Sequence, residues 1–503
     1  MQRRDFLSSL AASGLAGGIA RGARGPSPIA LQTGDVVPGR ATVWVRNSDA
    51  AEWSVTWRAG KGAARTVKGA PLTPDRDFTG RVDLTGVPAS AEITYEVALS
   101  GQSAKLTGKF KSAPGPGDNV RFLWSGDMVG QGWGINPDSG GITMFDQMRR
   151  TDPHFFLHSG DTIYADSPVP SEVKLPDGQL WRNLTIEEKS KVAETLDEFR
   201  GCYRYNLLDK NVLQFNASVS QVWQWDDHEL ANNWSPSKDF SNDARYREKD
   251  VKKLLARARQ AFLEYAPLRY DRAEATRVYR RIPYGPLMDL FVIDMRSYRG
   301  PNTHNRQTAE SIETAFLGAA QFDWLKRDLK ASKAVWKVIA ADMPIGLLVA
   351  DGKDAQGRAQ FEAIANGEGP ALGRELETAR LLRFIKESRI RNTVWLTADV
   401  HYTAAHYYDP AKAQFTNFNP FWEFVSGPLN AGTFGPGVLD NTFGPQVMFA
   451  KAPPKGQSNL SPAAGMQFFG QVSIEGKTKA LTVTLRDLSG AGIYSKTLAP
   501  EPA

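Results

Sequence analysis

Residues 155–166 read Phe-Phe-Leu-His-Ser-Gly-Asp-Thr-Ile-Tyr-Ala-Asp, an apolar run that passes directly into Gly160-Asp161 and then reaches Tyr164 and Asp166. The apolar part predicts a short strand covered on both faces, and the Gly-Asp pair predicts a tight turn at its carboxyl end. The same order of features recurs in Trp124-Ser-Gly-Asp127, Trp225-Asp-Asp-His-Glu-Leu-Ala-Asn-Asn233 and Leu396-Thr-Ala-Asp-Val-His401. Ligands of α/β sheets bind outside the carboxyl ends of the strands, so we expect these four strand ends to converge on one site.

The chain from Asn119 onward alternates short apolar runs with helical stretches. This alternation predicts an α/β catalytic domain over residues 119–500. Its last two strands, 467–474 and 479–486, are predicted to form a hairpin that ends the sheet. The other predicted strands are 120–124, 155–158, 222–225, 289–293, 336–340 and 393–397, and the predicted helices are 142–150, 186–203, 243–265, 319–331 and 375–388.

Residues 28–113 have a different pattern, in which apolar and polar residues alternate over short segments. The segments 41–46, 53–57, 81–85 and 92–98 predict strands, and they are separated by turns rich in Gly, Pro and Asp. Short alternating strands within about 100 residues are typical of a small all-β sandwich of the immunoglobulin or fibronectin type. The Pro/Gly-rich stretch 112–118 predicts the boundary between this domain and the next.

The first 25 residues predict export. Arg3-Arg4 precede Phe6-Leu7 and a short Gly/Ala-rich apolar run, which is typical of a signal read by the twin-arginine translocation machinery. The run is too short to span a bilayer, which needs ~20 apolar residues, and no transmembrane segment is expected elsewhere. We therefore expect a periplasmic or secreted protein. Cys202 is the one cysteine, so packing rather than disulfides must hold the chain together.

The net charge of +6 is modest for 503 residues, and no run of five like charges marks a nucleic-acid-binding arm. We expect no specific nucleic-acid binding. The acidic strand ends point instead to cations and an anionic substrate. Asp226, Asp227 and Glu229 surround His228 and would repel one another without a cation. Two or three cations about 3.5–4 Å apart can clamp a phosphate ester and activate water, and carboxylate, His and Tyr side chains are suitable ligands.

Four motifs taken together resemble the PhoD-like alkaline phosphatases, a branch of the calcineurin-like and purple-acid-phosphatase-type metallophosphoesterases. They are Ser-Gly-Asp161-x-x-Tyr164, Trp-Asp-Asp227-His228-Glu, Asp-Met-Arg296-Ser-Tyr-Arg299 and Ala-Asp399-Val-His401. The resemblance covers nearly the whole mature chain. It implies a four-layer αββα catalytic domain behind the small β-domain, a phosphate-ester substrate, and Fe³⁺ together with Ca²⁺.

The resemblance also assigns roles to individual residues. It makes Asp161 the carboxylate that bridges the metals and Tyr164 the iron-binding tyrosine, with Asp227, Asp399 and His401 as further ligands. His228 takes the place of the histidine that faces the substrate, and Arg296 or Arg299 that of a phosphate contact. We name His228 and Arg296 as catalytic and Asn233 and Arg299 as substrate-binding. For the arginines, a salt bridge that braces the site remains an equal alternative.

One position departs from the family pattern. Family members carry a cysteine ligand at the end of the first strand, whereas this chain has Asp127 there. Carboxylate in place of thiolate keeps the negative charge but is a harder ligand, which leaves the identity of the first metal open. His304 and His406 are the other candidate ligands, and we interpret each as a surface or structural residue.

The sequence therefore predicts hydrolysis of phosphate mono- or diesters at alkaline pH by a metal-bound hydroxide, with His228 stabilising charge or protonating the leaving oxygen. A phospholipase-type phosphodiesterase on the same scaffold remains an alternative. A binding protein that holds an envelope ligand is another, although the intact set of acids argues against it. The loops 166–182 and 346–373 are expected to set the specificity.

Overall fold

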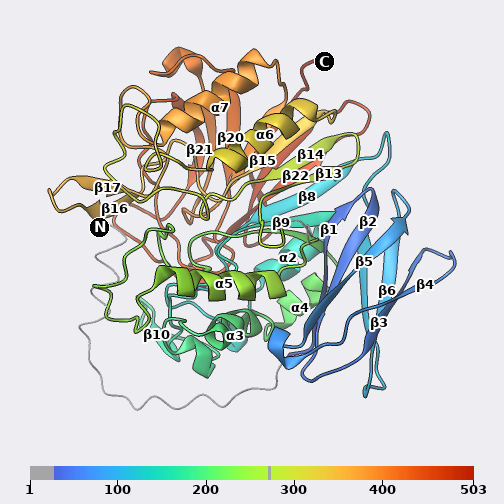
Figure 1. Ribbon diagram of the computed structural model, residues 1–503. Helices are drawn as coiled ribbons and strands as arrows, with labels where there is room; N and C mark the ends of the chain where they lie inside the picture. Colours follow the sequence, from blue (N-terminus) through green and yellow to red (C-terminus); the bar gives the residue numbers. More distant parts are fainter. Residues whose placement is uncertain (1–27, 270–273, 503) are drawn as a thin grey trace.

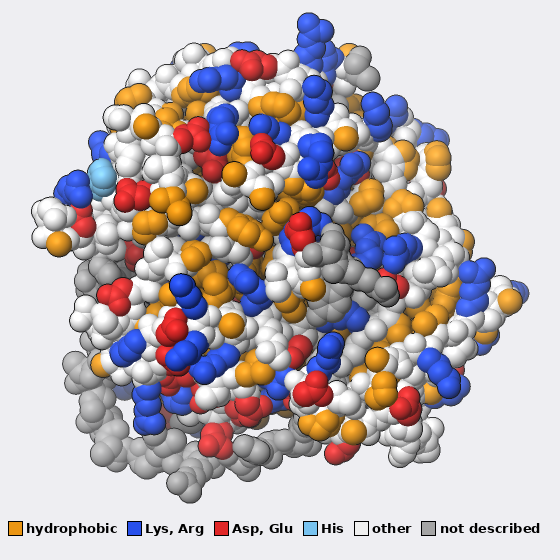
Figure 2. Space-filling model, in the orientation of Figure 1, with side chains coloured by type: hydrophobic (Ala, Val, Ile, Leu, Met, Phe, Trp, Pro, Cys, Tyr) orange, Lys and Arg blue, Asp and Glu red, His pale blue; other side chains and the backbone are white. Residues whose placement is uncertain are grey.

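A computed structural model describes residues 28–269 and 274–502 (Figure 1). The predicted export signal, residues 1–25, lies outside the described residues. On the face drawn in Figure 2, Lys and Arg side chains are interspersed with Asp and Glu, which fits the modest net charge of +6.

Two mixed sheets form the centre of the protein. The first has nine strands in the order β24-β23-β22-β8-β9-β12-β1-β2-β5. Its middle strands β8, β9, β12 and β1 are parallel, and its flanks are antiparallel. The strands are β1 (Ala30–Val37), β2 (Gly39–Arg46), β5 (Thr79–Val87), β8 (Val120–Ser125), β9 (Phe155–Ser159), β12 (Ser220–Gln224), β22 (Phe468–Ile474), β23 (Leu481–Asp487) and β24 (Gly492–Leu498).

The second sheet has seven strands in the order β13-β14-β15-β18-β20-β19-β21. Strands β14, β15, β18 and β20 are parallel, and antiparallel strands close both ends. The strands are β13 (Arg280–Tyr284), β14 (Met288–Val292), β15 (Trp336–Ala340), β18 (Thr393–Thr397), β19 (Thr403–Tyr408), β20 (Phe421–Val425) and β21 (Pro445–Lys451).

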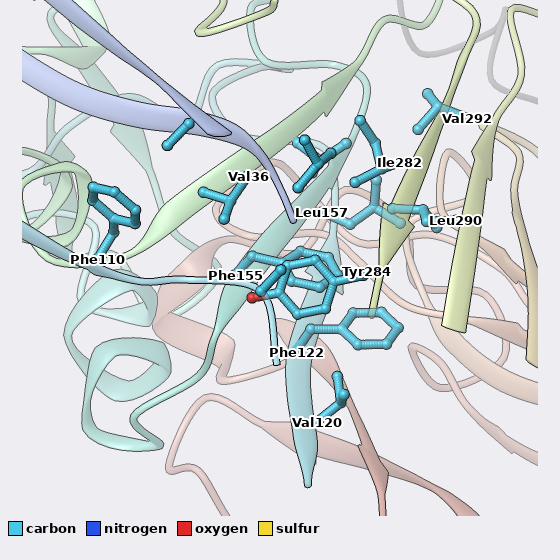
Figure 3. Close-up of a cluster of buried hydrophobic side chains, with 14 of the residues drawn as sticks. Val36, Phe110, Val120, Phe122, Phe155, Leu157, Ile282, Tyr284, Leu290 and Val292 are labelled. Atoms are coloured by element: carbon cyan, nitrogen blue, oxygen red, sulfur yellow. The ribbon is translucent and has the colours of Figure 1, made fainter. Parts of the chain in front are cut away.

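The inner faces of the two sheets share one apolar core. Phe122 of β8 and Leu157 of β9 belong to the same buried cluster as Leu290, Val338 and Leu396 of the second sheet. Figure 3 shows Phe122 and Phe155 beside Tyr284, and the rings of Phe155 and Tyr284 are 4.8 Å apart. The intervening residues Leu123 and Phe156 point to the opposite face and pack under helices, so both faces of these strands are buried. This explains the nearly continuous apolar runs in the sequence.

Helices cover the outer faces (Figure 1). Helices α2 to α5 pack on the nine-stranded sheet, and α6 and α7 pack on the seven-stranded sheet. Their bounds are α2 (Met144–Arg150), α3 (Leu196–Asn206), α4 (Lys210–Asn216), α5 (Val251–Tyr265), α6 (Ala319–Ala331) and α7 (Glu375–Glu387). Short 3₁₀ turns are η1 (Pro74–Arg76), η2 (Pro137–Ser139), η3 (Glu187–Lys189), η4 (Pro410–Lys412) and η5 (Pro462–Ala464).

The N-terminal β-strands do not all stay together. Strands β3 (Trp53–Ala59), β4 (Arg65–Lys68), β6 (Glu92–Leu99) and β7 (Leu106–Lys111) form a separate sheet in the order β4-β3-β6-β7. Strands β1, β2 and β5 instead extend the large sheet, because β1 pairs in parallel with β12 through Gly34 and Gln221. Two small hairpins complete the strands, β10 (Glu172–Lys174) with β11 (Leu180–Arg182), and β16 (Ala350–Lys353) with β17 (Ala359–Phe361).

The six predicted apolar strands and the helices predicted at 142–150, 319–331 and 375–388 are confirmed, with small shifts at their ends. Two predicted helices begin too early. Helix α3 starts after Thr195, whose hydroxyl and the Glu198 carboxylate form a capping box, and α5 starts after Asp250, whose carboxylate accepts the Lys252 N–H. The predicted C-terminal hairpin does not end the sheet, because β24 pairs with β23 and forms the edge.

Candidate metal centre

Four strand ends deliver acidic side chains to one buried cluster. Asp127 follows β8, Asp161 follows β9, Asp227 follows β12, and Asp399 follows β18 of the other sheet. Three sets of donor atoms each lie within 4.8 Å of one another: those of Asp127, Asp161 and His401, those of Asp161, Asp227 and His228, and those of Asp226, Asp227 and Asp399. Asp161 and Asp227 each belong to two sets, so the three sets form one continuous cluster.

The backbone at these positions is held in an unusual conformation. Asp127, Asp161, Asp399 and His401 have φ values of 62°, 50°, 64° and 61°, in the left-handed region that non-glycine residues rarely adopt. Such residues concentrate at functional sites, where the surrounding structure holds them in place. Gly160 makes the turn before Asp161 possible, because a Cβ there would lie 2.3 Å from the Asp226 Cβ. The Gly-Asp turn therefore brings the ends of β9 and β12 into contact.

Glu229 braces the turns that carry the acids. Its buried carboxylate accepts backbone N–H groups from Asp161 (3.1 Å), Thr162 (2.6 Å) and Asp226 (2.7 Å). Burial raises the pKa of Glu229 to about 7, although these N–H groups oppose the shift. The sequence contained Glu229 in the third motif, but its spacing gave no sign that it would tie two strand ends together.

The electrostatics of the cluster favour a bound cation. Burial, followed by the charges of Asp227 and Asp127, raises the pKa of Asp161 well above its usual range. Burial also raises the pKa of Asp226, despite the adjacent guanidinium of Arg296. Carboxylates packed this closely in a buried place are costly to ionise together, and a cation among them removes that cost.

Tyr164, His401 and His228 lie against one another at the edge of the cluster. The hydroxyl of Tyr164 is 2.9 Å from Nε2 of His401, and that nitrogen is 3.6 Å from Oδ1 of Asp127. Nδ1 of His401 is hydrogen-bonded to the backbone carbonyl of Gly432. The Tyr164 ring stacks on the imidazole of His228 at 4.2 Å. The structure thus brings all three predicted residues to the acids.

Asp166 orients His228 from the side away from the cluster. Its Oδ1 is 2.6 Å from Nδ1 of His228, and its Oδ2 accepts the Asn232 N–H at 2.8 Å. Nε2 of His228 points toward Asp227, 3.9 Å from Oδ1. Burial would raise the pKa of Asp166, but the His228 contacts outweigh it and lower that pKa. Asp166 ends the stretch 155–166 quoted above, and no role was predicted for it from the sequence.

Arg296 and Arg299 lie behind the cluster. Arg296 is fully buried and paired with three carboxylates: Asp226 (Nε–Oδ1 2.7 Å), Asp342 (Nε–Oδ2 3.0 Å) and Glu362. Arg299 is also buried, donates to Asn302 Oδ1 at 3.1 Å and to the Glu362 carbonyl, and has its pKa lowered to about 10 by burial. The ion pairs of Arg296 favour the alternative role, a brace for the acids, and the predicted contact of either arginine with the substrate phosphate stays a prediction. Arg296 would have to break buried ion pairs to reach a ligand, whereas Nε and Nη1 of Arg299 have no hydrogen-bond partner within the described chain.

Asn233 lies beside the cluster and is held from two directions. Its backbone N–H donates to Oδ2 of Asp227 at 2.6 Å, and its amide Nδ2 donates to Oδ1 of Asp351 at 3.1 Å. Asp351 belongs to the β16–β17 hairpin, and its Oδ2 accepts Nδ2 of Asn302 at 2.8 Å. A hairpin far away in the sequence is thereby attached to a residue next to the acids.

The other candidate histidines do not join the cluster. His406 is buried with Nδ1 2.9 Å from Glu423 Oε2, and His304 is partly exposed. Among the described residues, none of the sets of possible metal ligands includes either one. Both have the structural or surface placement that we expected from the sequence.

The residues present fit hard metal cations. Oδ2 of Asp161 is buried and has no hydrogen-bond partner within the described chain. Buried carboxylate oxygens normally have partners, so an oxygen of this kind at the centre of an acidic cluster is suited to a cation. The donor set is mostly carboxylate with histidine and a nearby phenol, which suits Ca²⁺ and Fe³⁺ better than thiophilic ions.

Comparisons with known proteins agree with the motifs. A family model described as "PhoD-like phosphatase" matches residues 122–485, and one described as its N-terminal domain matches residues 13–114. Alkaline phosphatase D of Bacillus subtilis (strain 168) is 27% identical over 358 residues, which are 68% of this chain. The match spans 57% of that relative's length. A solved structure titled "Structure of PhoD" superposes with a TM-score of 0.68 at 19% identity, covering 96% of this chain and 90% of the other.

Proposed function

This chain belongs to the PhoD-like phosphatase family, and on that premise we propose that it is a metal-dependent hydrolase of phosphate mono- or diesters that works at alkaline pH. The observation that carries the proposal is the buried cluster in which Asp161 and Asp227 each join two sets of possible ligands. An acidic cluster of this kind is able to hold neighbouring cations, which an anionic phosphate ester requires. We also propose that the two sheets and their helices form the four-layer αββα sandwich of the metallophosphoesterases.

Asp127, Asp161, Tyr164 and His401 would hold one metal, and Asp161, Asp227 and Asp399 the other. We propose Fe³⁺ at the first place, since a phenol is a good ligand for a strongly Lewis-acidic ion, and Ca²⁺ at the second, where the donors are carboxylates. Bound cations would neutralise the ester and activate water for attack. Asp127 takes the place of the family's cysteine, which makes the first set free of thiol.

His228 handles the leaving group in this proposal. Nδ1–H of His228 donates a hydrogen bond to Asp166, so the imidazole keeps one orientation and Nε2 is directed at the cluster. When the imidazole takes up a second proton, that proton is at Nε2 and can pass to, or hydrogen-bond with, the departing oxygen. Asn233 is a substrate contact in this proposal, because its Oδ1 is buried without a hydrogen-bond partner in the described chain beside Asp227. Arg296 and Arg299 stabilise the acids from behind.

We propose export to the periplasm or the exterior by the twin-arginine translocation machinery, with residues 1–25 as the signal. Arg3-Arg4 supports this, and the machinery's transport of folded proteins suits a buried metal cluster. Residues 28–113 and 119–500 are proposed as the N-terminal and catalytic domains. No helix in the described part of the chain has the length and apolar character needed to cross a bilayer.

The experiment is turnover of p-nitrophenyl phosphate and bis(p-nitrophenyl) phosphate at alkaline pH, with and without a chelator, followed by elemental analysis. We expect turnover of at least one substrate, its loss on chelation and its return when iron and calcium are added. Turnover of neither substrate by protein that contains metal would contradict the proposal, as would full activity after the metals are removed.

A further inference from the structure

A small buried cavity lies behind the turn that carries Asp161. It is about 20 Å³ in volume and lies between the outer face of the nine-stranded sheet and helix α3. The polar side chains that line it come from separate elements. They include Gln32 of β1, His158 of β9, Thr162 of the turn after β9, and Tyr203 of α3. All four are buried, with at most 2% of their surface exposed. A cavity needs ~10–15 Å³ of such volume to hold a water molecule, so this one is large enough.

Four of the polar side chains that line the cavity have atoms without a protein partner. Oε1 of Gln32, Oγ1 of Thr162 and the hydroxyl of Tyr203 have no hydrogen-bond partner within the described chain. The ring of His158 has only a contact with the backbone of Gly160, which leaves at least one of its nitrogens without a partner. Most buried polar atoms are hydrogen-bonded, because leaving one unpaired costs free energy. Unpaired polar atoms on four residues that line a single cavity indicate a shared ligand.

The chemistry of the lining selects that ligand. Among the described residues that line the cavity, none is acidic and none is Lys or Arg, so neither a cation nor an anion is favoured. Burial lowers the pKa of His158 to about 3, so its ring is neutral and offers one donor and one acceptor. The hydroxyl groups of Thr162 and Tyr203 also donate and accept, and Oε1 of Gln32 accepts. A small neutral molecule that both donates and accepts hydrogen bonds is therefore suited to all four side chains.

We propose that this cavity is a binding site for ordered water, which completes the hydrogen bonding of His158, Thr162 and Tyr203. Thr162 follows Asp161, and its other polar groups are already held. Its N–H donates to Oε1 of Glu229 at 2.6 Å, and its carbonyl accepts Nδ2 of Asn206 at 2.6 Å. A water molecule hydrogen-bonded to Oγ1 would hold the remaining polar group of Thr162, its hydroxyl. The water site is therefore part of the structure that supports the turn at Asp161, and this inference does not depend on the metals or the substrate.

A crystal structure that shows ordered solvent tests the site directly, together with the same crystals under xenon pressure. We expect density for water within hydrogen-bonding distance of Thr162 Oγ1 and a His158 nitrogen, and no xenon in the cavity. Dry apolar cavities bind xenon, whereas hydrated polar ones are already filled. A cavity without water density, or one occupied by xenon, would overturn the proposal.

The sign of a stability change gives a second test in solution. Tyr203→Phe removes only the hydroxyl. If that hydroxyl is bonded to water, the variant has a lower free energy of unfolding than the parent protein, measured by urea denaturation. If the cavity is dry, the variant removes an unpaired buried group and is more stable, which would overturn the proposal. Tyr205→Phe on the same helix is the matched control. Its hydroxyl contacts Ile135 N (2.9 Å) and Leu184 O (2.7 Å), so this variant loses stability in either case.

Discussion

Oδ1 of Asp166 lies 2.6 Å from Nδ1 of His228, on the side of the imidazole that faces away from the buried acids. The other oxygen of Asp166 accepts the backbone N–H of Asn232, so the carboxylate cannot turn without breaking a second hydrogen bond. The orientation of His228 is therefore set by Asp166, which in our proposal binds neither the metals nor the substrate.

Asp166→Asn should lower kcat by ~10–100-fold, the usual cost of losing a partner that orients a functional side chain. His228→Ala should lower it further, by ~10²–10⁴-fold, with the metals retained. The double variant should be no slower than His228→Ala, because Asp166 acts through His228. Steady-state kinetics and elemental analysis measure this, with Asp239→Asn, an exposed surface change, as the control. Independent, multiplying losses in the double variant would contradict the orienting role.

The convergence of the acidic residues on one site could be predicted from the sequence, because each apolar run that forms a strand is followed directly by the residue that joins the site. Each apolar run buries itself in a parallel strand, and the polar residue after it is carried to the same edge. The same pattern was available at Ala340-Ala-Asp342, where Asp342 follows β15 and binds Arg296, but it stood outside the motifs. The roles of Glu229 and Glu362 were not predictable, since they depend on contacts between residues more than 60 positions apart.

Asp161→Asn should abolish turnover and reduce bound metal together, because one residue serves two sets of ligands. The metal-free variant should be at least as stable as metal-free parent protein, since it loses a carboxylate that its neighbours repel. Elemental analysis, kinetics and thermal unfolding measure the three effects. Full metal content at a near-normal rate would exclude Asp161 as the shared ligand.

Tyr164→Phe should bleach the protein if ferric iron occupies the first set. A phenolate bound to Fe³⁺ gives a charge-transfer band, so the concentrated parent protein should be violet to pink. Ferric iron can hold the phenol deprotonated well below its free pKa of ~10. Visible absorption spectra and kinetics before and after the substitution measure this, and activity should fall in parallel. A colourless, fully active parent protein that contains only zinc or calcium would show that Tyr164 merely packs beside the cluster.

Asp351→Ala should loosen the β16–β17 hairpin and weaken substrate binding. Its carboxylate joins Asn233 and Asn302. Losing the one hydrogen bond that positions Asn233 costs ~0.5–1.5 kcal/mol, which corresponds to a KM increase of about 2–10-fold with little change in kcat. Trypsin should cut faster after Lys353 and Arg358, and this measurement does not depend on the activity of the enzyme. Gln356→Ala at the exposed tip of the hairpin is the control. Unchanged proteolysis and KM would show that the hairpin is held by other contacts.

The arrangement of the N-terminal strands could not be predicted from their alternation. Alternation of apolar and polar residues indicates a strand with one covered face, but it does not indicate which sheet the strand joins. The predicted strands 41–46 and 81–85 were assigned to the small sandwich, yet as β2 and β5 they extend the large sheet together with β1, which was not predicted, because the edge of β12 is open to β1. Edge pairing depends on backbone groups, which every residue except proline carries, and the side-chain pattern therefore does not record it.

The last prediction concerns the stability of the metal-free protein as the pH rises. Burial raises the pKa of Glu229 to about 7 and also raises that of Asp161, whereas the same groups in the unfolded chain titrate near ~4. The folded chain thus binds more protons than the unfolded chain between about pH 4 and 7, and the free energy of unfolding must fall across that window. Asp166 and Asp77 have lowered pKa values, so their contributions are lost only as the pH falls below ~4.

Glu375, whose pKa burial raises to about 9, makes the free energy of unfolding change with pH in the same direction whether or not metals are bound. The difference between metal-free and metal-loaded protein, from urea denaturation at a series of pH values, therefore isolates the cluster. We expect this difference to grow from pH 4 to 7, because a cation stabilises the ionised acids and removes their contribution to the slope. Equal slopes with and without metal would mean that no cation binds among these carboxylates.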